Sequence, residues 1–252
     1  MILVKNALLS FNRITLPDLD QVKLMDRTDK KFCLHRRLLP DILEALKNDY
    51  ALLEIEGETI FPYHNMYFDT VDDQMFINHQ NGKRNRFKIR VRQYVHSNDN
   101  FLEIKFKNNK GRTIKERIKR PDFQTKLKVT DLDFIQKSLP YAASELLPKI
   151  RSNFDRITLV NNNFTERITI DTFPGFKNLD TEIILANLVI IEVKQSKANK
   201  SALITKVLGE HKIRRQGFSK YCVGRSLLEE NIKQNNFKPL LLKIRKEYLT
   251  NL

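Results

Sequence analysis

Three short segments in the middle of the chain alternate between charged and apolar residues, and nearly all of the charge is positive. In residues 87–94, every second position is a cation, namely Lys88, Arg90 and Arg92, with apolar residues between them. Successive side chains of a β-strand point to opposite faces of its sheet. The pattern therefore predicts a strand with one cationic face and one apolar face.

The next two segments repeat this pattern, and a turn joins them. Their charged positions are Glu103, Lys105 and Lys107 in residues 101–107, and Lys115, Arg117 and Lys119 in residues 113–119. The sequence Asn-Asn-Lys-Gly at 108–111 is typical of a β-hairpin turn. Neighbouring strands with such dense positive charge indicate either a basic sheet surface or the wall of a basic cavity, and both would bind a polyanion.

Such a surface is costly without a bound anion. Two like charges about 4 Å apart repel by about 4 kcal/mol at an effective dielectric constant of about 20. A closed barrel with its charges inside and helices over its apolar outer face would hold a polyanion that relieves this repulsion, and it would leave few open strand edges. The alternative is that each strand exposes its charged face to water, which is the usual arrangement of charge on a strand.

The overall composition also favours an anionic partner. The chain has 252 residues, a net charge of +15 and a pI near 9.7, which suit nucleic acid, nucleotide, polyphosphate or an acidic membrane surface. Cys33 and Cys222 are too few for a disulfide framework or a zinc site. The N-terminus lacks a signal-peptide pattern, and the nearly apolar run 183–191 is far shorter than the roughly 20 residues that span a bilayer. We expect a cytoplasmic protein with no membrane span of its own.

The rest of the chain alternates between strand and helix patterns, without a long linker or a repeat. We expect a helix and an extended piece in 1–22, strands at 23–34, 59–68, 151–159, 165–172 and 188–194, and helices at 38–50, 131–139, 144–149, 201–208 and from 219 onward. The predicted fold class is α+β: one domain over residues 1–252, a closed antiparallel β-barrel or tunnel with a basic interior, covered outside by helices. Residues 1–22 are its N-terminal segment and residues 225–252 its C-terminal helical tail.

Several short motifs, taken in this order, resemble those of one protein family. They are Tyr67-Phe68-Asp69-Thr70, Lys88-Ile89-Arg90-Val91-Arg92, Leu102-Glu103-Ile104-Lys105, Glu166-Arg167-Ile168-Thr169-Ile170-Asp171-Thr172, Ile191-Glu192-Val193-Lys194 and Ser219-Lys220-Tyr221. The set resembles the catalytic domain of the vacuolar transporter chaperone (VTC) family, which belongs to the triphosphate tunnel metalloenzymes. No single motif is specific to the family, but the occurrence of all of them in this order, from about residue 27 to about residue 224, is specific.

The resemblance implies a polyphosphate polymerase, which binds ATP and a divalent metal, Mn²⁺ or Mg²⁺, and transfers the γ-phosphoryl group to a polyphosphate chain in its tunnel. By matching positions, it implies catalytic roles for Lys31, Arg90, Arg92, Lys105, Arg156, Arg167 and Lys220, and metal binding by Glu192. We expect further cations to bind substrate, namely Lys88, Lys107, Lys115, Arg117, Lys119 and Lys194. ATP and polyphosphate are the expected partners, nucleic acid is not, and the oligomeric state is left open.

The sequence also departs from the wider superfamily. Where that superfamily opens with Glu-x-Glu-x-Lys, this chain has Arg27, Asp29 and Lys31, and the lost acid disfavours a two-metal hydrolytic site. Eukaryotic family members add an inositol-phosphate-sensing domain and membrane helices, for which this chain has no room, so translocation would need a membrane-protein partner. The segment 73–86 does not align with the family, and the candidates for the family's arginine there are His79, Lys83, Arg84 and Arg86.

Phosphoryl transfer suits this set of residues. The reaction asks a protein for positioning and charge neutralisation rather than for covalent chemistry. Arginine grips phosphate oxygens with paired hydrogen bonds, and lysine acts as a point charge. The acids have simpler interpretations as well. Glu192 would otherwise neutralise Lys194. For Glu103 we favour an ion pair with Lys105, and Asp171 is open between a helper role and an ion pair.

Two other functions remain open. A triphosphatase would use the same tunnel, with water in place of the acceptor chain. A non-catalytic module would bind polyphosphate or nucleic acid, although nucleic acid is disfavoured because the cations alternate with aliphatic rather than with stacking aromatic residues. Formation of long polyphosphate from ATP would separate the polymerase from both.

Overall fold

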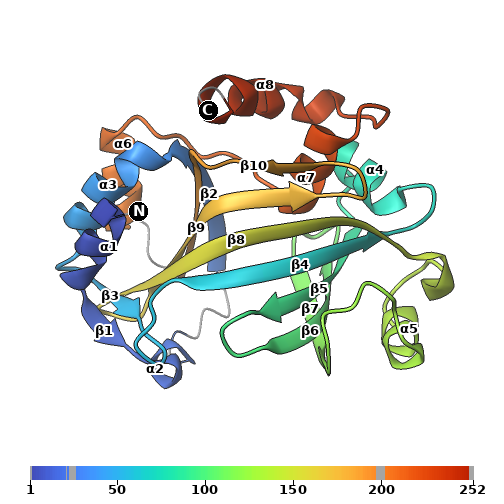
Figure 1. Cartoon of the computed structure of the whole chain (residues 1–252), viewed down its shortest axis with the longest axis horizontal. Helices are drawn as coiled ribbons and strands as arrows, with labels where there is room; N and C mark the ends of the chain where they lie inside the picture. The colour runs from blue at the N-terminus through green and yellow to red at the C-terminus, as the bar shows by residue number, and fades with distance from the viewer. Residues whose placement is uncertain (1, 21, 23–26, 197–201, 250–252) are drawn as a thin grey trace.

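The computed structural model describes residues 2–20, 22, 27–196 and 202–249, which form one large curved sheet with helices packed around it (Figure 1). The strands are β1 (Asn12–Ile14), β2 (Arg27–His35), β3 (Tyr50–Leu53), β4 (Phe61–Asp69), β5 (Arg86–Tyr94), β6 (Asp99–Lys107), β7 (Thr113–Arg120), β8 (Leu147–Asn161), β9 (Glu166–Lys177), β10 (Glu182–Ile184) and β11 (Leu188–Ser196). The α-helices are α1 (Ile2–Leu9), α2 (Leu16–Asp20), α3 (Leu39–Leu46), α4 (Gln74–Gln80), α5 (Val129–Gln136), α6 (Leu203–Glu210), α7 (Lys220–Leu228) and α8 (Lys238–Tyr248). Short 3₁₀ turns are η1 (Arg36–Leu38), η2 (Ala143–Glu145) and η3 (Asn235–Phe237), and the predicted α+β class is confirmed.

The two ends of the sheet are not joined by strand pairing. The strand order is β2-β11-β9-β8-β4-β5-β6-β7, with β10 beside β9, and with β3 linking β8 to β1. Among the described residues β2 and β7 do not pair, so the predicted closed barrel is not confirmed. The chain before α7 covers the outer edge of β2 instead, because the Gln216 N–H donates to the Lys31 carbonyl at 2.8 Å and Arg215 forms a bridge with Phe32.

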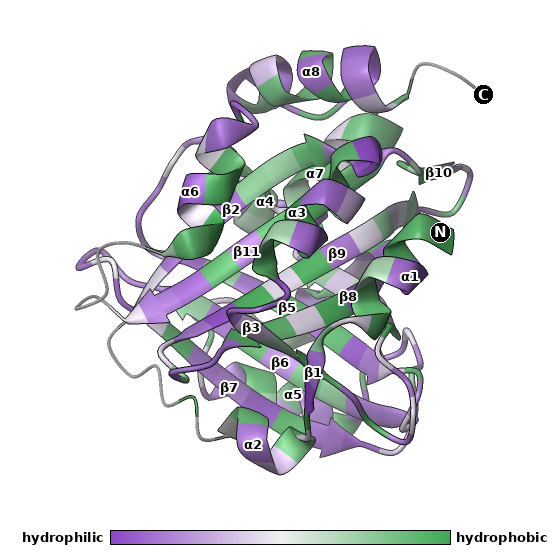
Figure 2. Ribbon diagram, turned by 90° about the vertical axis from the view of Figure 1, so that its left-hand side faces the viewer, coloured by the Kyte–Doolittle hydropathy of each residue, from purple (hydrophilic) through white to green (hydrophobic). Residues whose placement is uncertain are grey.

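Helices cover the apolar outer face of the sheet, as predicted. α1, α3 and α6 pack over β2, β8, β9 and β11 (Figure 2). Val189 and Ile191 of β11 are buried in the same cluster as residues of these helices. α5 packs over β5 and β6, against Ile89 and Leu102. Burial of one such side chain contributes about 1.5–3 kcal/mol. These apolar positions alternate with the charged ones, so the charged side chains point to the opposite face.

α3 shows how the sequence forms one of these helices. Four apolar residues recur at helical spacing and are all buried, namely Leu39, Ile42, Leu43 and Leu46. Pro40 lies in the first turn, where a backbone N–H would lack a helical partner in any case. The helix is shorter than the predicted 38–50, because the buried strand β3 begins at Tyr50.

One helix lies on the other face of the sheet. Cys222 of α7 packs with Cys33 of β2 and Ile190 of β11. These two positions lie two residues from Lys31 and Glu192, on the same face of their strands. α7 therefore closes one end of the concave face, with α8 packed in the same cluster, and the expectation that helices cover only the outside does not hold for α7.

Residues 144–149 do not form the predicted helix. The single turn η2 leads directly into β8, which begins at Leu147. Pro148 explains the difference, since the residue before a proline avoids the helical conformation. The missing N–H of Pro148 is tolerated where the pairing of β8 with β4 is irregular. The strand β1 lies within the extended piece expected in 1–22, whereas the short strands β3 and β10 are not predicted. The predicted residues 23–26 and 201 lie outside the described residues.

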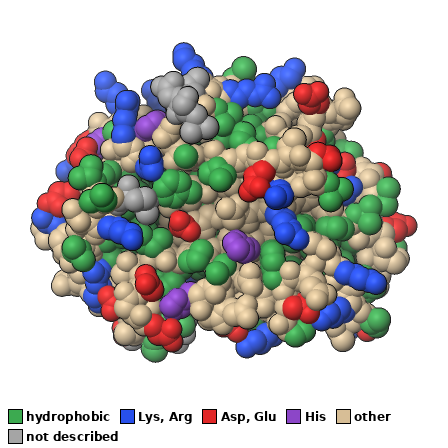
Figure 3. All heavy atoms as spheres, in the orientation of Figure 1, with side chains coloured by type: hydrophobic (Ala, Val, Ile, Leu, Met, Phe, Trp, Pro, Cys, Tyr) green, Lys and Arg blue, Asp and Glu red, His purple; other side chains and the backbone are tan. Residues whose placement is uncertain are grey.

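The surface is mixed in charge where Figure 3 shows it. On that face, Lys and Arg side chains are dispersed among acidic, hydrophobic and neutral groups. No helix in the described part of the chain has the length and apolar character needed to cross a bilayer.

The close docking of α7 yields a first prediction. A Cβ on Gly224 would lie 2.5 Å from Cδ1 of Phe176 and 2.8 Å from Cδ1 of Ile150. We predict that Gly224→Ala lowers the free energy of unfolding by about 1–3 kcal/mol through overpacking, as measured by chemical denaturation. Gly209→Ala in α6 is the control, because a Cβ there meets nothing within 4 Å, and it should be neutral or stabilising. Equal destabilisation by both substitutions would contradict the close docking.

Candidate functional site

The cations predicted from the sequence gather on the concave face of the sheet. They come from β2, β5, β6, β8, β9 and β11 and from the first residue of α7. The set is Lys31, Lys88, Arg90, Arg92, Lys105, Arg156, Arg167, Lys194 and Lys220. We call it the basic face.

Strand register and sheet curvature bring these residues together. Lys88 of β5 pairs with Lys105 of β6, and Lys31 of β2 pairs with Glu192 of β11. Lys105 also interacts electrostatically with Lys31 and Glu192, although β6 lies at the opposite end of the strand order. The two ends of the sheet therefore face each other with cations between them, which is the convergence that the sequence pattern predicts.

Two carboxylates on this face are held by arginine. Asp171 accepts hydrogen bonds from Arg156 at 2.6 and 2.9 Å, and it also contacts Lys220. Burial alone would raise the pKa of Asp171, but Arg156 and Lys220 hold this pKa well below its usual range. Glu103 accepts a hydrogen bond from Arg90 at 2.6 Å rather than pairing with Lys105 as expected. Burial opposes ionisation of Glu103, but Arg90 dominates and lowers its pKa to about 2.

Glu192 is the third carboxylate, and it has a cationic neighbour on its own strand. Lys194 Nζ donates to Glu192 at 2.8 Å, which agrees with the simpler interpretation of this acid. Burial opposes ionisation, yet Lys31 and Lys194 hold the pKa of Glu192 well below its usual range. Glu192 is therefore an anion among cations, and a hard metal ion carrying phosphate would meet a charged oxygen ligand there.

Several lysines on this face give up protons unusually easily. Burial lowers the pKa of Lys88 to about 7, and the nearby charge of Lys105 adds to the effect. Burial also lowers the pKa values of Lys194 and Lys220 to about 8, against the opposing influence of Glu192 and Asp171. A bound anion would restore these protons, because it stabilises the charged form of each lysine.

The start of α7 points into the basic face. Ser219 caps the helix and accepts from the Cys222 N–H. Lys88 Nζ donates to Ser219 Oγ at 2.9 Å, and Lys31 Nζ donates to the Phe218 carbonyl at 3.0 Å. The N-terminal dipole of α7 therefore adds to the charge of these lysines, and both favour a phosphate group at this point.

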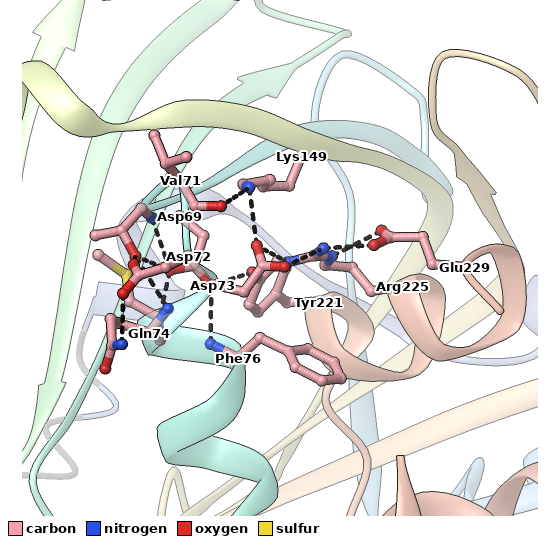
Figure 4. Close-up of polar contacts among 12 residues, drawn as sticks. Asp69, Val71, Asp72, Asp73, Gln74, Phe76, Lys149, Tyr221, Arg225 and Glu229 are labelled. Carbon is pink, nitrogen blue, oxygen red and sulfur yellow. Dashed lines mark hydrogen bonds and ion pairs between the residues drawn. The ribbon is translucent and has the colours of Figure 1, made fainter. Parts of the chain in front are cut away.

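A polar network behind the basic face fixes α7 (Figure 4). Asp69, at the end of β4, accepts from the N–H groups of Met75 at 2.9 Å and Phe76 at 2.8 Å, and from the Tyr221 hydroxyl. It thus joins β4, the first turn of α4 and α7. Burial followed by the charge of Asp69 holds the pKa of Tyr221 well above its usual range, so the phenol remains a donor.

Arg225 completes this network one turn further along α7. Its guanidinium donates to Asp73 at 2.6 and 3.0 Å and to Glu229 at 2.7 Å, and Lys149 contacts Asp73 at 2.8 Å. Figure 4 shows Arg225 between these two acids. The sequence reading treats Asp69 as a turn residue and does not single out Arg225. The only local signal is the spacing of four residues between Arg225 and Glu229, which does not reveal the second partner, Asp73, just before α4.

Aromatic rings orient two arginines of the basic face, and one of these rings, Phe154, also lies 4.0 Å from Lys220 Nζ. The rings of Tyr63 and Phe154 stack with centroids 5.4 Å apart. The Arg156 guanidinium lies 4.9 Å from the Tyr63 ring centre and 5.0 Å from that of Phe154, and Arg92 lies 5.3 Å from Tyr63. Arg92 also donates to Asn65 at 3.0 Å. These contacts hold the guanidinium planes in place before any ligand arrives.

The remaining predicted cations lie on the rim. Lys115, Arg117 and Lys119 are exposed on the edge strand β7, where charge also prevents pairing with other chains. Lys119 contacts Asp99 at 2.8 Å. Lys107 pairs with Arg86 at the end of β5 and β6. Their substrate-binding role stays a prediction.

The structure narrows the candidates in the segment 73–86. The charge of Lys88 affects the pKa of His79, and the charge of Arg86 affects the pKa of Lys88, so both residues lie near Lys88. Lys83 and Arg84 are exposed in the loop between α4 and β5. Burial, followed by the charge of Lys88, lowers the pKa of His79 to about 2, so the imidazole is neutral. Arg86 continues the alternation of Lys88 and Arg90 along β5, so it lies on the same side of the strand as these two cations.

A family profile agrees with this geometry. The VTC domain matches residues 26–229, most of the chain. The chain belongs to the VTC domain family. A comparison with curated proteins gave no match.

Solved structures similar to this VTC domain have low sequence identity and show the fold alone. HpAC1 from Hippeastrum, named as an adenylyl cyclase with a dominant triphosphatase activity, has a TM-score of 0.51 and 16% identity over 79% of this chain and 94% of its own. An adenylate cyclase by name from Bacillus halodurans has a TM-score of 0.50 and 15% identity over 77% of this chain and 94% of its own. These structures share the overall fold of this chain.

A divalent metal fits this site only together with a phosphate ligand. Among the described residues, no group of three or more His, Cys, Asp or Glu side chains could enclose a metal ion. Mg²⁺ and similar hard ions are commonly held by one or two carboxylates together with substrate phosphates. Glu192 on the basic face fits that pattern, whereas Asp171 and Glu103 are already engaged by arginines.

The depressed pKa of Lys88 yields a second prediction. Near pH 8 the free protein has lost much of the Lys88 proton, because its pKa is about 7, so binding of tripolyphosphate should take that proton up again. Calorimetry in buffers of different ionisation enthalpy would measure the uptake. Lys88→Met should reduce it, whereas Lys137→Met, on the exposed end of α5, should not. Equal proton uptake by the wild type, Lys88→Met and Lys137→Met would show that Lys88 is not the group that gains the proton.

Proposed function

We propose that this VTC domain transfers the γ-phosphoryl group of ATP to the end of an inorganic polyphosphate chain held on the basic face. The observation that carries the proposal is the convergence of cations from both ends of the sheet around the start of α7. Such a site offers many phosphate contacts, and its aromatic rings gather at one end, where Tyr63, Tyr94 and Phe154 lie together. It suits a linear polyanion better than a nucleic acid.

The residues have separate tasks in this reaction. Arg90, Arg92 and Arg156 bind non-bridging phosphate oxygens through their forked donors, and neighbouring rings and carboxylates hold those donors in place. A terminal oxygen of the acceptor chain attacks the γ-phosphorus, the bond to the bridging oxygen breaks, and ADP leaves. Lys220, the first residue of α7, and Lys88, which contacts Ser219 from β5, neutralise charge that gathers on the transferred group.

Glu192 would hold the divalent cation, Mn²⁺ or Mg²⁺, which neutralises phosphate oxygens when bound. No serine, cysteine or histidine nucleophile is needed, because the acceptor phosphate supplies the attacking oxygen. Cys33 and Cys222 fit this scheme as buried structural residues. Burial raises the pKa of Cys33 to about 12, which keeps its thiol protonated.

A triphosphatase is the second candidate, favoured by the activity named for HpAC1. Water would then replace the acceptor chain at the same phosphorus. A binding module without turnover is the third candidate. A cytoplasmic location and a membrane-protein partner for translocation stay predictions.

Product analysis separates these functions. We predict that the purified chain, with ATP and Mn²⁺ or Mg²⁺, forms acid-precipitable long polyphosphate and ADP. Orthophosphate as the sole phosphate product would instead establish hydrolysis. The absence of both products, with polyphosphate still bound, would leave a binding module.

Glu192 provides a further prediction. Glu192→Ala should lower turnover at least about 100-fold, because the metal loses its protein ligand, while tripolyphosphate binding without metal is retained or tightened as a negative charge is removed. Glu182→Ala is the matched control, since Glu182 forms an exposed ion pair with Lys177 on β10 and β9. If Glu192→Ala turns over as fast as the wild type, Glu192 is not the ligand of the catalytic metal.

A further inference from the structure

A small basic hollow lies at the end of the basic face, outside the site described above. It has a volume of about 320 Å³, and the loop between α4 and β5 and the hairpin between β6 and β7 form its walls. The cations that line it are Arg84, Arg86, Lys107 and Lys110, and the remaining lining residues are glycines and asparagines. We call it the basic mouth. Its lining contains no acidic residue and no aromatic ring.

The basic mouth continues the basic face in strand register. Arg86 pairs with Lys107, and the next pair on the same side of β5 and β6 is Lys88 with Lys105. Arg86 and Lys105 both lower the pKa of Lys88, so the electrostatic fields of mouth and face overlap. A linear polyanion that occupies the basic face would meet the cations of the mouth next.

Local hydrogen bonds fix the hairpin that forms one wall of the mouth. Gly111 has a φ of +80°, and its N–H donates to the Asn108 carbonyl at 3.0 Å, while the Arg112 N–H donates to Asn108 Oδ1 at 2.9 Å. Gly82, on the opposite wall, has a φ of +69°. Neither glycine would place a Cβ within 4 Å of another atom, so the hollow is not packed with side chains at these points.

We propose that the basic mouth is a second binding site, which holds the distal phosphates of a long polyphosphate chain whose end lies on the basic face. The proposal rests on the proposed function for the identity of the ligand. The opposite end of the basic face carries Tyr63, Tyr94 and Phe101, rings that would suit a nucleoside. The mouth has only charge and amide groups, which suit a ligand made of phosphate alone.

Chain length is the variable that tests this assignment. Tripolyphosphate is short enough to bind on the basic face alone, whereas a long polyphosphate would reach both sites. Arg84 and Lys110 are exposed, and no hydrogen bond or ion pair of theirs is seen among the described residues, so their replacement should leave the fold intact. We therefore compare the double variant Arg84→Ser, Lys110→Ser with the wild-type chain.

Binding is measured without ATP or metal, by titration with tripolyphosphate and with long inorganic polyphosphate at one fixed ionic strength. We expect the double variant to bind long polyphosphate about tenfold more weakly, and tripolyphosphate as the wild type does. The control variant Lys137→Ser, Lys206→Ser removes the same charge from the outer helices α5 and α6 and should bind both ligands normally.

The outcomes separate the mouth from the proposed reaction. Unchanged binding of long polyphosphate, or an equal loss for both ligands, would overturn the second site. Weaker binding in the control variant as well would show a general effect of net charge, and would also overturn it. If the wild type makes no polyphosphate from ATP, but the double variant still binds long polyphosphate more weakly, the second site is supported and the polymerase function is not. If the wild type makes polyphosphate, but the double variant binds long polyphosphate as tightly as the wild type, the polymerase function is supported and the second site is not.

Discussion

Mutual repulsion of cations is the constraint on which the rest of this structure depends. Lysines and arginines from both ends of the sheet converge on one face, where the carboxylates Asp29, Glu103, Asp171 and Glu192 only partly balance them. Burial is the main cause of the depressed pKa of Lys88, and the charges of Lys105, Lys31 and Arg86 lower it further. A phosphate ligand supplies the missing negative charge, so the same repulsion that destabilises the empty site becomes affinity for a polyanion.

α7 connects this electrostatic site to the apolar part of the fold. Its first residues touch the basic face, whereas Tyr221 is held by Asp69 at the end of β4 and Arg225 by Asp73, just before α4. Gly224 permits α7 to approach Phe176 and Ile150 closely. The position of Lys220 is therefore set by packing and hydrogen bonds several residues away, which makes α7 a rigid support rather than a mobile lid.

The local part of this structure was predictable from the sequence, and the long-range part was not. Alternation along 87–94 predicts β5 and assigns Lys88 and Arg90 to one face, because the period of a strand is a local property. The family motifs then indicate which strands share that face. The partner of Arg225 depends on how α4 meets α7, and no local pattern encodes such a contact. The unpaired edges of β2 and β7 depend on global curvature in the same way.

The most direct test of the central claim is the thermal stability of the chain with phosphates of increasing length at constant ionic strength. Our account predicts that the unfolding temperature rises from orthophosphate to tripolyphosphate, because a longer anion neutralises more of the opposed cations and binds only the folded state. It predicts that the rise is much smaller in Lys88→Met. An unfolding temperature that follows ionic strength alone, whatever the phosphate, would show that these cations do not form one binding site.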